Sequence, residues 1–426
     1  MDKFDSVIVG GGLAGLTASV YLAKAGQKVA VLEKSGRFGG RADTVTKNGV
    51  KLNLGGHALY RGGAACEILQ ELGITLEGNT PSLKTYGLWK NKTYLMPTGM
   101  LSMISCPLLS VSGKMELTRL MMKLGKIDAS AVPPVSLREW TEQEVRDPMV
   151  RHLFYALTRT ATYVNDPDLL RAPSTLKQLK RALTESVLYL DGGWETIVSK
   201  LRRLAEKYGA AMLSGKNATG IVHNRGQVRQ VRCSDGTLLE ADAVIVTASP
   251  AEAFRMIKDA ERTSLQKWKE QALPIKAACL DLGLRTLPNA NHQFAMGIDQ
   301  PLLFTNQSRA AKLSDDGTSV VHLLKYNGVR HGDAQEDEAL LEKTLDTLQP
   351  GWRQEVAARQ YLPNITVVHD FDHTGRQELP GPAVPQIGGL YVAGDWAGHG
   401  ELLVDASFAS ARRAALHILQ TVPALH

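Results

Sequence analysis

The chain has 426 residues, of which 44% are hydrophobic and 22% charged, and its formal net charge is +6. This length allows roughly two or three domains' worth of buried core, and the dispersed basic residues exclude nucleic acid as an expected partner. The four cysteines are scattered and no histidines cluster at metal-ligand spacing, so we expect a reducing, cytoplasmic location and no metal site.

The N-terminus shows no sign of export. The first strand begins almost at once, without a basic leader segment or a cleavage site, so we expect no signal peptide. No run of about eighteen consecutive apolar residues is present, which predicts that no helix crosses a membrane.

Residues 5–44 begin with a pattern that predicts a β-α-β unit. An apolar run at residues 7–9 indicates a strand buried on both faces of a parallel sheet. Helical composition follows over residues 13–25 and ends at Gly26. A second apolar run at residues 29–32 indicates the next strand.

Three glycines and one acid in this unit form the pattern of a dinucleotide-binding site. Gly10, Gly12 and Gly15 fit G-x-G-x-x-G, in which the glycines allow the turn, the close approach of the pyrophosphate and the packing of helix on strand. The helix N-terminus would face the phosphates, and Glu33 can accept hydrogen bonds from a ribose. The alternative is a glycine-rich turn without a ligand.

The next segment, residues 36–44, reads GRFGGRADT. With the preceding glycines and acid, it resembles the signature of the flavoprotein superfamily of monoamine oxidases, protoporphyrinogen oxidases and phytoene desaturases. The resemblance implies FAD rather than NAD as the tightly held cofactor. Arg37 and Arg41 offer planar donor forks suited to a pyrophosphate, and the glycine pair at 39 and 40 lets the backbone pass close to the cofactor.

Residues 52–60 form a predicted strand that ends in Gly55 and Gly56. In this superfamily such a strand brings the chain under the flavin ring, so the resemblance implies that His57 lies near the isoalloxazine. The alternative is a loop histidine satisfied by backbone groups.

Residues 63–183 leave the dinucleotide pattern and predict a helix-rich insertion. Ser136 and Glu139 form a capping-box pattern that opens one of its helices. The apolar, uncharged stretch at residues 99–112 is expected to form a lid or buried loop. Contact with a membrane surface is the alternative for this stretch.

At residues 188–194 the cofactor pattern returns, with a Gly-Gly turn before a predicted helix at 195–208. Three short strands are predicted at 218–223, 228–233 and 238–240, and a separate strand at 241–248. The resemblance places an adenine contact at Val222, for which an ordinary strand valine is the alternative.

A second insertion covers residues 256–371 and opens with an apolar strand at 274–284 that carries one lysine, Lys276. In many amine-oxidase-like relatives a lysine here holds a water at flavin N5. A desolvated lysine would have a lowered pKa. The alternative is a strand-end lysine that faces solvent.

The C-terminal part repeats the resemblance with the sequence GGLYVAGDW at residues 388–396. Asp395 looks like the residue that binds the ribityl–phosphate region. A helix beginning near Leu403 would aim its amides at flavin N1 and C2=O, where its partial positive charge stabilises anionic reduced flavin.

The predicted fold is therefore α/β, with a Rossmann-like, glutathione-reductase-like FAD-binding domain and an inserted mixed α+β substrate domain. We predict the FAD-binding domain over residues 1–62, 184–255 and 372–426, and the substrate domain over 63–183 and 256–371. Lys276 and His57 are the predicted catalytic residues. The predicted cofactor-binding residues are Gly10, Gly12, Leu13, Ala14, Gly15, Glu33, Lys34, Arg37, Gly40, Arg41, Gly55, Gly56, His57, Ala58, Val222, Gly394, Asp395, Leu402 and Leu403.

The resemblance implies removal of hydride from a largely apolar or conjugated small molecule, with oxygen or another electron acceptor as second partner. Leu402 and Leu403 stand where amine oxidases place an aromatic, which weakens the alternative of an amine or amino-acid oxidase. A flavin-dependent isomerase or non-redox flavoprotein is the second alternative. The absence of cysteine after Cys279 excludes a C-terminal cysteinyl flavin link, whereas a histidyl link through His57 or His399 stays open.

Overall fold

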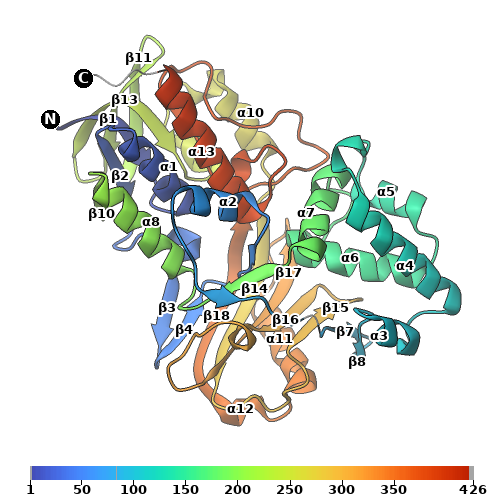
Figure 1. The fold of residues 1–426 in the computed structure, drawn as a ribbon. Coiled ribbons are helices and arrows are strands. Elements are labelled where there is room, and N and C mark those ends of the chain that lie inside the picture. The colour runs from blue at the N-terminus through green and yellow to red at the C-terminus, as the bar shows by residue number, and fades with distance from the viewer. Residues whose placement is uncertain (1, 83, 422–426) are drawn as a thin grey trace.

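The computed structural model describes residues 2–82 and 84–421, which form two large sheets and a helical layer (Figure 1). The first sheet, named here the nucleotide sheet, has the strand order β10-β2-β1-β13-β12-β11, with β19 beside β13. Its strands are β1 (Asp2–Val9), β2 (Val29–Glu33), β10 (Ala211–Ser214), β11 (Ala218–Asn224), β12 (Gln227–Cys233), β13 (Leu238–Val246) and β19 (Leu390–Val392).

One strand of the nucleotide sheet differs from the prediction of two strands at 238–240 and 241–248. β13 runs without a break from Leu238 to Val246. It pairs parallel with β1 along one edge, while β12 and then β19 pair with its other edge. No turn-forming residue separates the two predicted strands, so a single strand serves both neighbours.

Helices cover both faces of the nucleotide sheet. On one face α1 (Leu13–Lys24) is buried between α8 (Glu195–Lys207) and α13 (Leu403–Thr421), with α2 (Ala64–Glu71) beside α13 (Figure 1). A Cβ atom on Gly15 would lie 1.9 Å from the carbonyl oxygen of Gly10, so α1 packs this closely only with glycine there. The other face is covered by α9 (Pro250–Arg255) and α10 (Ser264–Gln271).

The second sheet, named here the mixed sheet, has the order β18-β14-β17-β16-β15-β7-β8. Its outer face packs on α11 (Ala334–Leu348) and α12 (Trp352–Glu355), and its inner face turns toward the chain after β4 (Val50–Asn53). The strands are β7 (Tyr86–Trp89), β8 (Lys92–Leu95), β14 (Ile275–Leu284), β15 (Phe294–Gly297), β16 (Leu302–Asn306), β17 (Ser319–Gly328) and β18 (Val356–Val368).

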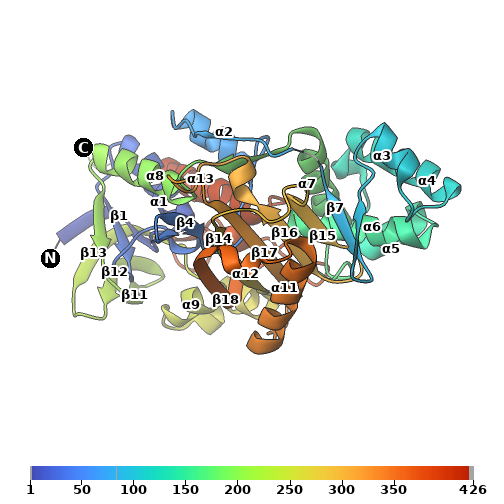
Figure 2. The same cartoon turned by 90° about the horizontal axis from the view of Figure 1, so that it is seen from below.

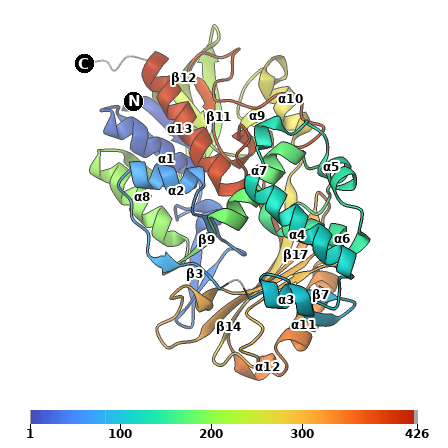
Figure 3. The same cartoon turned by 45° about the vertical axis from the view of Figure 1, so that its right-hand side comes forward.

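The helical layer forms one end of the molecule, opposite β11 to β13 (Figure 2). The helices of this layer are α3 (Met100–Ser105), α4 (Val111–Lys126), α5 (Leu137–Glu144), α6 (Pro148–Thr162) and α7 (Ala172–Thr184). In Figure 3, where the layer is turned forward, α4 and α6 lie side by side over a shared apolar core. Short strands β3 (Thr44–Lys47), β5 (Leu59–Tyr60), β6 (Gly78–Asn79) and β9 (Val187–Leu190) join the layers.

The stretch at residues 99–112 is not the expected buried loop, and a role as a lid stays a prediction. It forms the surface helix α3 and the start of α4, with Leu101 exposed to 83% and Val111 to 76%. Among its described residues Cys106 and Leu109 are buried, and the partly buried Met103 and Leu108 pack against the same apolar core.

Other local predictions are confirmed. The Ser136 hydroxyl accepts from the Glu139 amide and the Glu139 carboxylate accepts from the Ser136 amide, which completes the predicted capping box. The four cysteines are unpaired. Across residues 2–82 and 84–421, no helix combines the length and the apolar character needed to cross a membrane.

Candidate functional site

The turn after β1 leaves an open backbone surface at the start of α1. Gly12 is the N-cap residue, and a Cβ atom there would have only the Gly39 carbonyl oxygen, at 3.9 Å, within contact range. The first amides of a helix lack partners within the helix, and the helix dipole makes that end attractive to anions. This turn therefore fits a phosphate group, as its sequence predicts.

Glu33, at the end of β2, fixes the shape of the same turn. Its buried carboxylate accepts hydrogen bonds from the Gly11 amide at 2.9 Å and from the Ser35 amide at 2.8 Å. Each carboxylate oxygen can accept more than one hydrogen bond. Glu33 can therefore hold the turn and still accept from a ribose hydroxyl.

An ion pair joins the two predicted cofactor signatures, which lie 354 positions apart in the sequence. Arg41 Nη1 donates to Asp395 Oδ2 at 2.7 Å and also to the Val367 carbonyl at 2.7 Å. The same carboxylate oxygen accepts from the His369 amide at 2.9 Å. The other oxygen, Asp395 Oδ1, is buried without a hydrogen-bond partner among the described residues.

The charge on Asp395 is maintained by this surrounding. Burial disfavours the carboxylate, but Arg41, His369 and their hydrogen bonds outweigh it and hold the pKa of Asp395 below its ordinary value. Burial also lowers the pKa of His369, a neighbour that the sequence did not single out. A charged, buried acceptor with a free oxygen fits a hydroxyl-bearing ligand.

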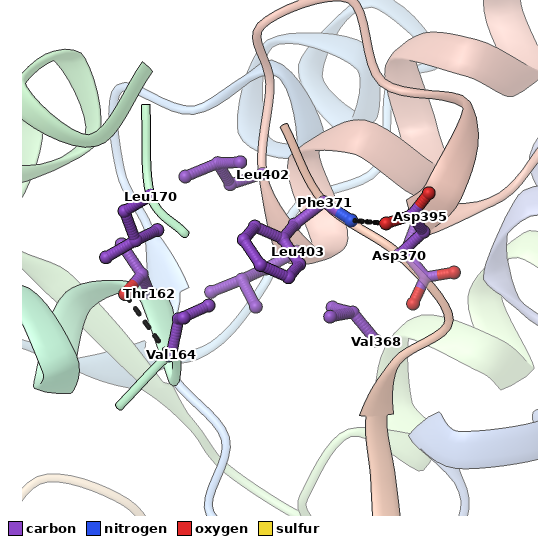
Figure 4. Close-up of a pocket in the computed structure, with 9 residues that line it drawn as sticks. All are labelled: Thr162, Val164, Leu170, Val368, Asp370, Phe371, Asp395, Leu402 and Leu403. Atoms are coloured by element: carbon purple, nitrogen blue, oxygen red, sulfur yellow. Dashed lines mark hydrogen bonds between the residues drawn. The ribbon is translucent and has the colours of Figure 1, made fainter. Parts of the chain in front are cut away.

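A small apolar pocket adjoins Asp395 and the start of α13 (Figure 4). Leu403 has a φ of 56°, an uncommon left-handed conformation for leucine, at the first residue of α13. The chain therefore turns sharply where the helix N-terminus opens onto the pocket. The lining residues are Thr162, Val164, Leu170, Val368, Asp370, Phe371, Asp395, Leu402 and Leu403.

Residues 54–58, named here the strap, run between β4 and β5 against the inner face of the mixed sheet. Gly55 has a φ of 105°, and a Cβ atom there would lie 2.8 Å from Ile365 Cδ1, so this position requires glycine. The Gly56 carbonyl accepts from the Tyr163 hydroxyl, and the His57 carbonyl accepts from Gln307 Nε2, both at 2.8 Å. The strap is thus held from both sides.

The His57 ring is satisfied within the strap. Its Nδ1 lies 2.8 Å from the Gly55 carbonyl oxygen, and its ring centroid lies 4.7 Å from that of Trp194. Burial lowers the pKa of His57 to about 4, so the ring is neutral at pH 7. The His57 ring therefore has the backbone partner expected of a loop histidine. Because the ring is neutral, it has no cationic role.

An apolar wall on the mixed sheet faces the strap. Its members, Tyr163, Ala277, Cys279, Leu324, Tyr326 and Ile365, form one packed cluster. Burial raises the pKa of the Tyr163 hydroxyl and the Cys279 thiol well above their ordinary values, so both are neutral. The wall therefore offers an uncharged surface next to the strap.

Beside this wall, on the same face of the mixed sheet, strand register aligns a buried polar row. Thr305, His322, Asp281 and Gln360 are successive cross-strand partners. Asp281 accepts hydrogen bonds from His322, from Gln360 at 3.0 Å and from Cys279 at 2.9 Å. Gln360 also donates to the Asn53 carbonyl at 3.0 Å, which ties the row to the end of β4.

Three members of this neighbourhood, Cys279, Asp281 and His322, bring metal-ligand atoms within 4.8 Å of one another. The sequence predicts no metal site. His322 comes from a neighbouring strand, so no local spacing of residues reveals the cluster. In the structure the three side chains are hydrogen-bonded to one another through Asp281. Strand register, rather than a motif, creates this cluster.

Lys276 is the second residue of β14 and is half-buried. Its Nζ donates to Thr366 Oγ1 at 2.6 Å. The two residues after Thr366 on β18 reach the pocket. The Val367 carbonyl accepts a hydrogen bond from Arg41, and Val368 lines the pocket. Lys276 is therefore near the site but has a hydroxyl partner of its own.

Three predicted cofactor residues have other surroundings. Arg37 is 55% exposed and pairs with Asp43 at 2.7 Å, and the exposed Lys34 pairs with Glu252 at 3.4 Å. The segment beside Glu33 is 215–216, where the Lys216 amide donates to the Glu33 carbonyl at 2.8 Å. Val222 lies half-buried on β11, six residues beyond Lys216, and its adenine contact stays a prediction.

The sequence matches known flavoproteins. A profile of the flavin containing amine oxidoreductases matches residues 13–275. A phytoene desaturase of Neurospora crassa is 24% identical over 316 residues, which are 64% of this chain and 53% of that protein. A hydroxyneurosporene desaturase of Cereibacter sphaeroides is 24% identical over 58% of this chain and 56% of its own length. The chain thus spans about half the length of these curated relatives.

Solved structures share the fold over nearly the whole chain. An oxidoreductase from Methanosarcina mazei aligns with a TM-score of 0.79 over 96% of this chain and 99% of its own, at 20% identity. Putrescine oxidase bound to putrescine aligns with a TM-score of 0.74 over 98% and 99%, at 17% identity. These likenesses confirm the predicted α/β fold with a separate mixed-sheet domain.

Proposed function

The chain belongs to the flavin containing amine oxidoreductase family, and we propose that it is an FAD-dependent oxidoreductase that removes hydride from a largely apolar or conjugated small molecule. The observation that carries the proposal is the Arg41–Asp395 ion pair, with the unpartnered Asp395 Oδ1 beside it. The pair unites two distant signatures at one point and leaves an acceptor for a hydroxyl group. Neither an NAD-type unit nor a bare glycine turn requires that arrangement.

We propose that the first glycine turn, Glu33 and Arg41 hold the ADP half of FAD, and that Asp395 accepts from a ribityl hydroxyl. Bound FAD would supply the hydride acceptor. The strap and the start of α13 would border the flavin, and the amides of α13 carry the partial positive charge that favours an anionic ring. Lys34, Arg37 and Val222 stay sequence predictions without support from their contacts.

The chain's own contribution to the reaction is to orient the substrate and exclude water. The apolar wall faces the strap with neutral side chains, of which Tyr163 and Tyr326 stack edge to face with ring centroids 5.6 Å apart. Hydride transfer needs a carbon–hydrogen bond held in a dry site more than it needs an acid–base pair. This wall suits an apolar or conjugated substrate better than a hydrophilic one.

Anaerobic reduction of the purified protein separates the candidate functions. Conjugated apolar substrates are expected to bleach the flavin absorbance, whereas primary amines are not. Bleaching by primary amines alone would favour the amine oxidase alternative. Rearrangement of a substrate by dithionite-reduced protein, without net oxidation, would favour the isomerase.

We further propose that Lys276 affects flavin reoxidation or reduction from its place near the pocket. Lys276→Met should change the rate of at least one half-reaction in stopped-flow measurements. Lys269→Met, on α10, is the control and should leave both rates unchanged. Unchanged rates in Lys276→Met would remove this residue from the site.

The proposal includes a peripheral contact with an anionic lipid surface through α3 and α4. Leu101, Ile104, Val111, Met115 and Met122 are exposed to 61–83%. Arg119 and Lys126 are exposed on the same helix as Met115 and Met122. Figure 2 places these helices at one end of the molecule, where an apolar face with a basic rim can meet a membrane.

A further inference from the structure

We infer that Arg309 is a binding subsite for an anionic group, such as a carboxylate, on the substrate. This inference rests on the proposed function, because it concerns the ligand that would lie beside the strap. The substrate would then carry a negatively charged group on its apolar or conjugated body, whereas a protonated amine is positively charged.

The guanidinium of the partly buried Arg309 lies against two aromatic rings, and two of its three nitrogen atoms lack polar partners. Its Cζ lies 5.1 Å from the ring centroid of Phe294 and 5.7 Å from that of Tyr189. Nε and Nη1 are buried and have no hydrogen-bond partner within the described part of the chain. Arg309 also forms no ion pair with any carboxylate of residues 2–82 and 84–421.

Such a group calls for a ligand of the opposite charge. Removing a guanidinium from water without hydrogen bonds is costly, because its charge and its donors both lose hydration. The ring faces offset part of this cost through cation–π attraction. Nε and Nη1 keep N–H donors without a partner, and guanidinium donors match the oxygens of a carboxylate.

The position of Arg309 connects it to the candidate site. It is the last residue of the short helix η4 (Gln307–Arg309), which follows β16. Gln307 of the same helix donates to the His57 carbonyl of the strap at 2.8 Å. Phe294 pairs with Thr305 in strand register and packs against the apolar wall. Arg309 therefore lies at the edge of the wall that faces the strap.

A second arginine at the same wall shows the contrast. Arg159 lies over the ring of Tyr326, with its Cζ 5.8 Å from the centroid. Its Nη atoms donate to Asn165 Oδ1 at 3.2 Å and to the carbonyls of Gly297 and Gln300, whereas its Nε is buried without a partner. Both Nη atoms of Arg159 are therefore used, whereas Nη1 of Arg309 has no partner.

Neither of these two arginines forms an ion pair with a carboxylate among the described residues, although the charge of Asp299 acts on Arg159. Asp281 lies on the same face of the mixed sheet as the wall, and it accepts from His322, Gln360 and Cys279. The two guanidinium groups place positive charge at the edge of the wall. This field attracts an anionic ligand and disfavours a protonated amine.

Calorimetric titration of the purified full chain tests the subsite with cinnamate, its neutral analogue cinnamamide and the cation cinnamylamine. Cinnamate should bind at least about tenfold more tightly than cinnamamide, and cinnamylamine should bind most weakly. Decanoate serves as a second carboxylate with an aliphatic body.

Arg309→Gln should weaken cinnamate binding about ten- to hundredfold and leave cinnamamide binding unchanged. Arg309→Lys, which keeps the charge but not the fork, should fall between. Arg229→Gln, at an exposed position of β12, is the matched control and should behave as wild type. Near-ultraviolet circular dichroism confirms that each variant is folded.

Equal cinnamate affinity in wild type and Arg309→Gln would overturn the inference, as would a preference for cinnamylamine. Failure of both carboxylates to bind at millimolar concentration would also overturn it. The flavin content of the same samples is read separately from their absorbance. Yellow wild-type protein with no carboxylate preference would refute the subsite alone, whereas protein that takes up no flavin would refute the proposed function.

Discussion

At the scale of single residues, two arginines from one motif have different surroundings. Arg41 joins a nearly buried carboxylate of the C-terminal signature, whereas Arg37 pairs with Asp43 at the surface. Both side chains are about half exposed, and both nitrogen–oxygen distances are 2.7 Å. The difference lies in the partner, because Asp395 is buried and has a free oxygen directed at no other described residue.

Replacing Arg41 should therefore affect both the flavin and the fold. Arg41→Met leaves the Asp395 carboxylate buried without its cation, so we expect loss of bound flavin and a fall of about 1–3 kcal/mol in the free energy of unfolding. The ratio of visible to ultraviolet absorbance and urea denaturation measure the two effects. Arg37→Met is the control, and it should retain flavin with a change of less than about 1 kcal/mol. Equal losses in both variants would contradict the assignment.

Asp405, in the first turn of α13, makes stability depend on pH. Its buried carboxylate accepts from the Ala65 amide and from Arg181, both at 2.9 Å. Burial is the larger influence and raises the pKa of Asp405 to about 6. The native state therefore binds this proton more tightly than the unfolded chain, and this contribution to stability is lost as pH rises from about 4 to about 6.

Asp405→Asn should remove that dependence. Relative to the variant, wild type should lose up to about 3 kcal/mol of stability between pH 4 and pH 6, since a shift of one pKa unit corresponds to about 1.4 kcal/mol. Differential scanning calorimetry at several pH values measures the difference in Tm. A difference that does not change over this range would show that Asp405 stays ionised.

At the scale of elements, the polar row couples the mixed sheet to β4 and the strap. Asp281 accepts three hydrogen bonds from side chains of β14, β17 and β18, and Gln360 passes the connection to Asn53. Asn53 in turn hydrogen-bonds Gln307, which holds the His57 carbonyl. Buried polar contacts from outside the strap therefore position it, in addition to the glycine that it requires at Gly55.

Removing the centre of this network should destabilise the protein and loosen the strap. Asp281→Ala leaves buried donors of His322 and Gln360 without an acceptor, for which we expect a loss of about 3–5 kcal/mol and weaker flavin retention. Chemical denaturation and flavin release kinetics measure these effects. Asp315→Ala, at a side chain that is 97% exposed, is the control and should change neither. A loss in Asp281→Ala below about 1 kcal/mol would show that the network contributes little.

At the scale of the whole molecule, local patterns were predictable and long-range contacts were not. The β-α-β unit follows from neighbouring residues, so its strands, helix and glycines were predictable. Arg41 and Asp395 were each predicted as cofactor residues, but their ion pair depends on how distant segments fold together. Gln307, Arg309 and His322 were missed, because strand register and a short helix bring them to the site without a sequence motif.

The cofactor site does not require the exposed apolar face of α3 and α4. The double variant Leu101→Ser, Ile104→Ser should bind vesicles of phosphatidylserine and phosphatidylcholine at least about tenfold more weakly. Each substitution removes apolar area from the contact with the lipid. Leu183→Ser, at a position of α7 that is 45% exposed, is the control. Vesicle flotation measures binding. Absence of wild-type binding, even at low salt, would contradict a lipid contact.

The central claim is that the two ends of this chain close one FAD site. Its most direct test is the flavin content of the purified protein, released by acid and identified by chromatography, in wild type and in Asp395→Ala. The account predicts FAD in wild type at a ratio approaching one per chain and a large loss in Asp395→Ala, whose fold is verified by circular dichroism. Wild-type protein that neither contains nor takes up FAD, or an Asp395→Ala variant that retains it fully, would contradict the account.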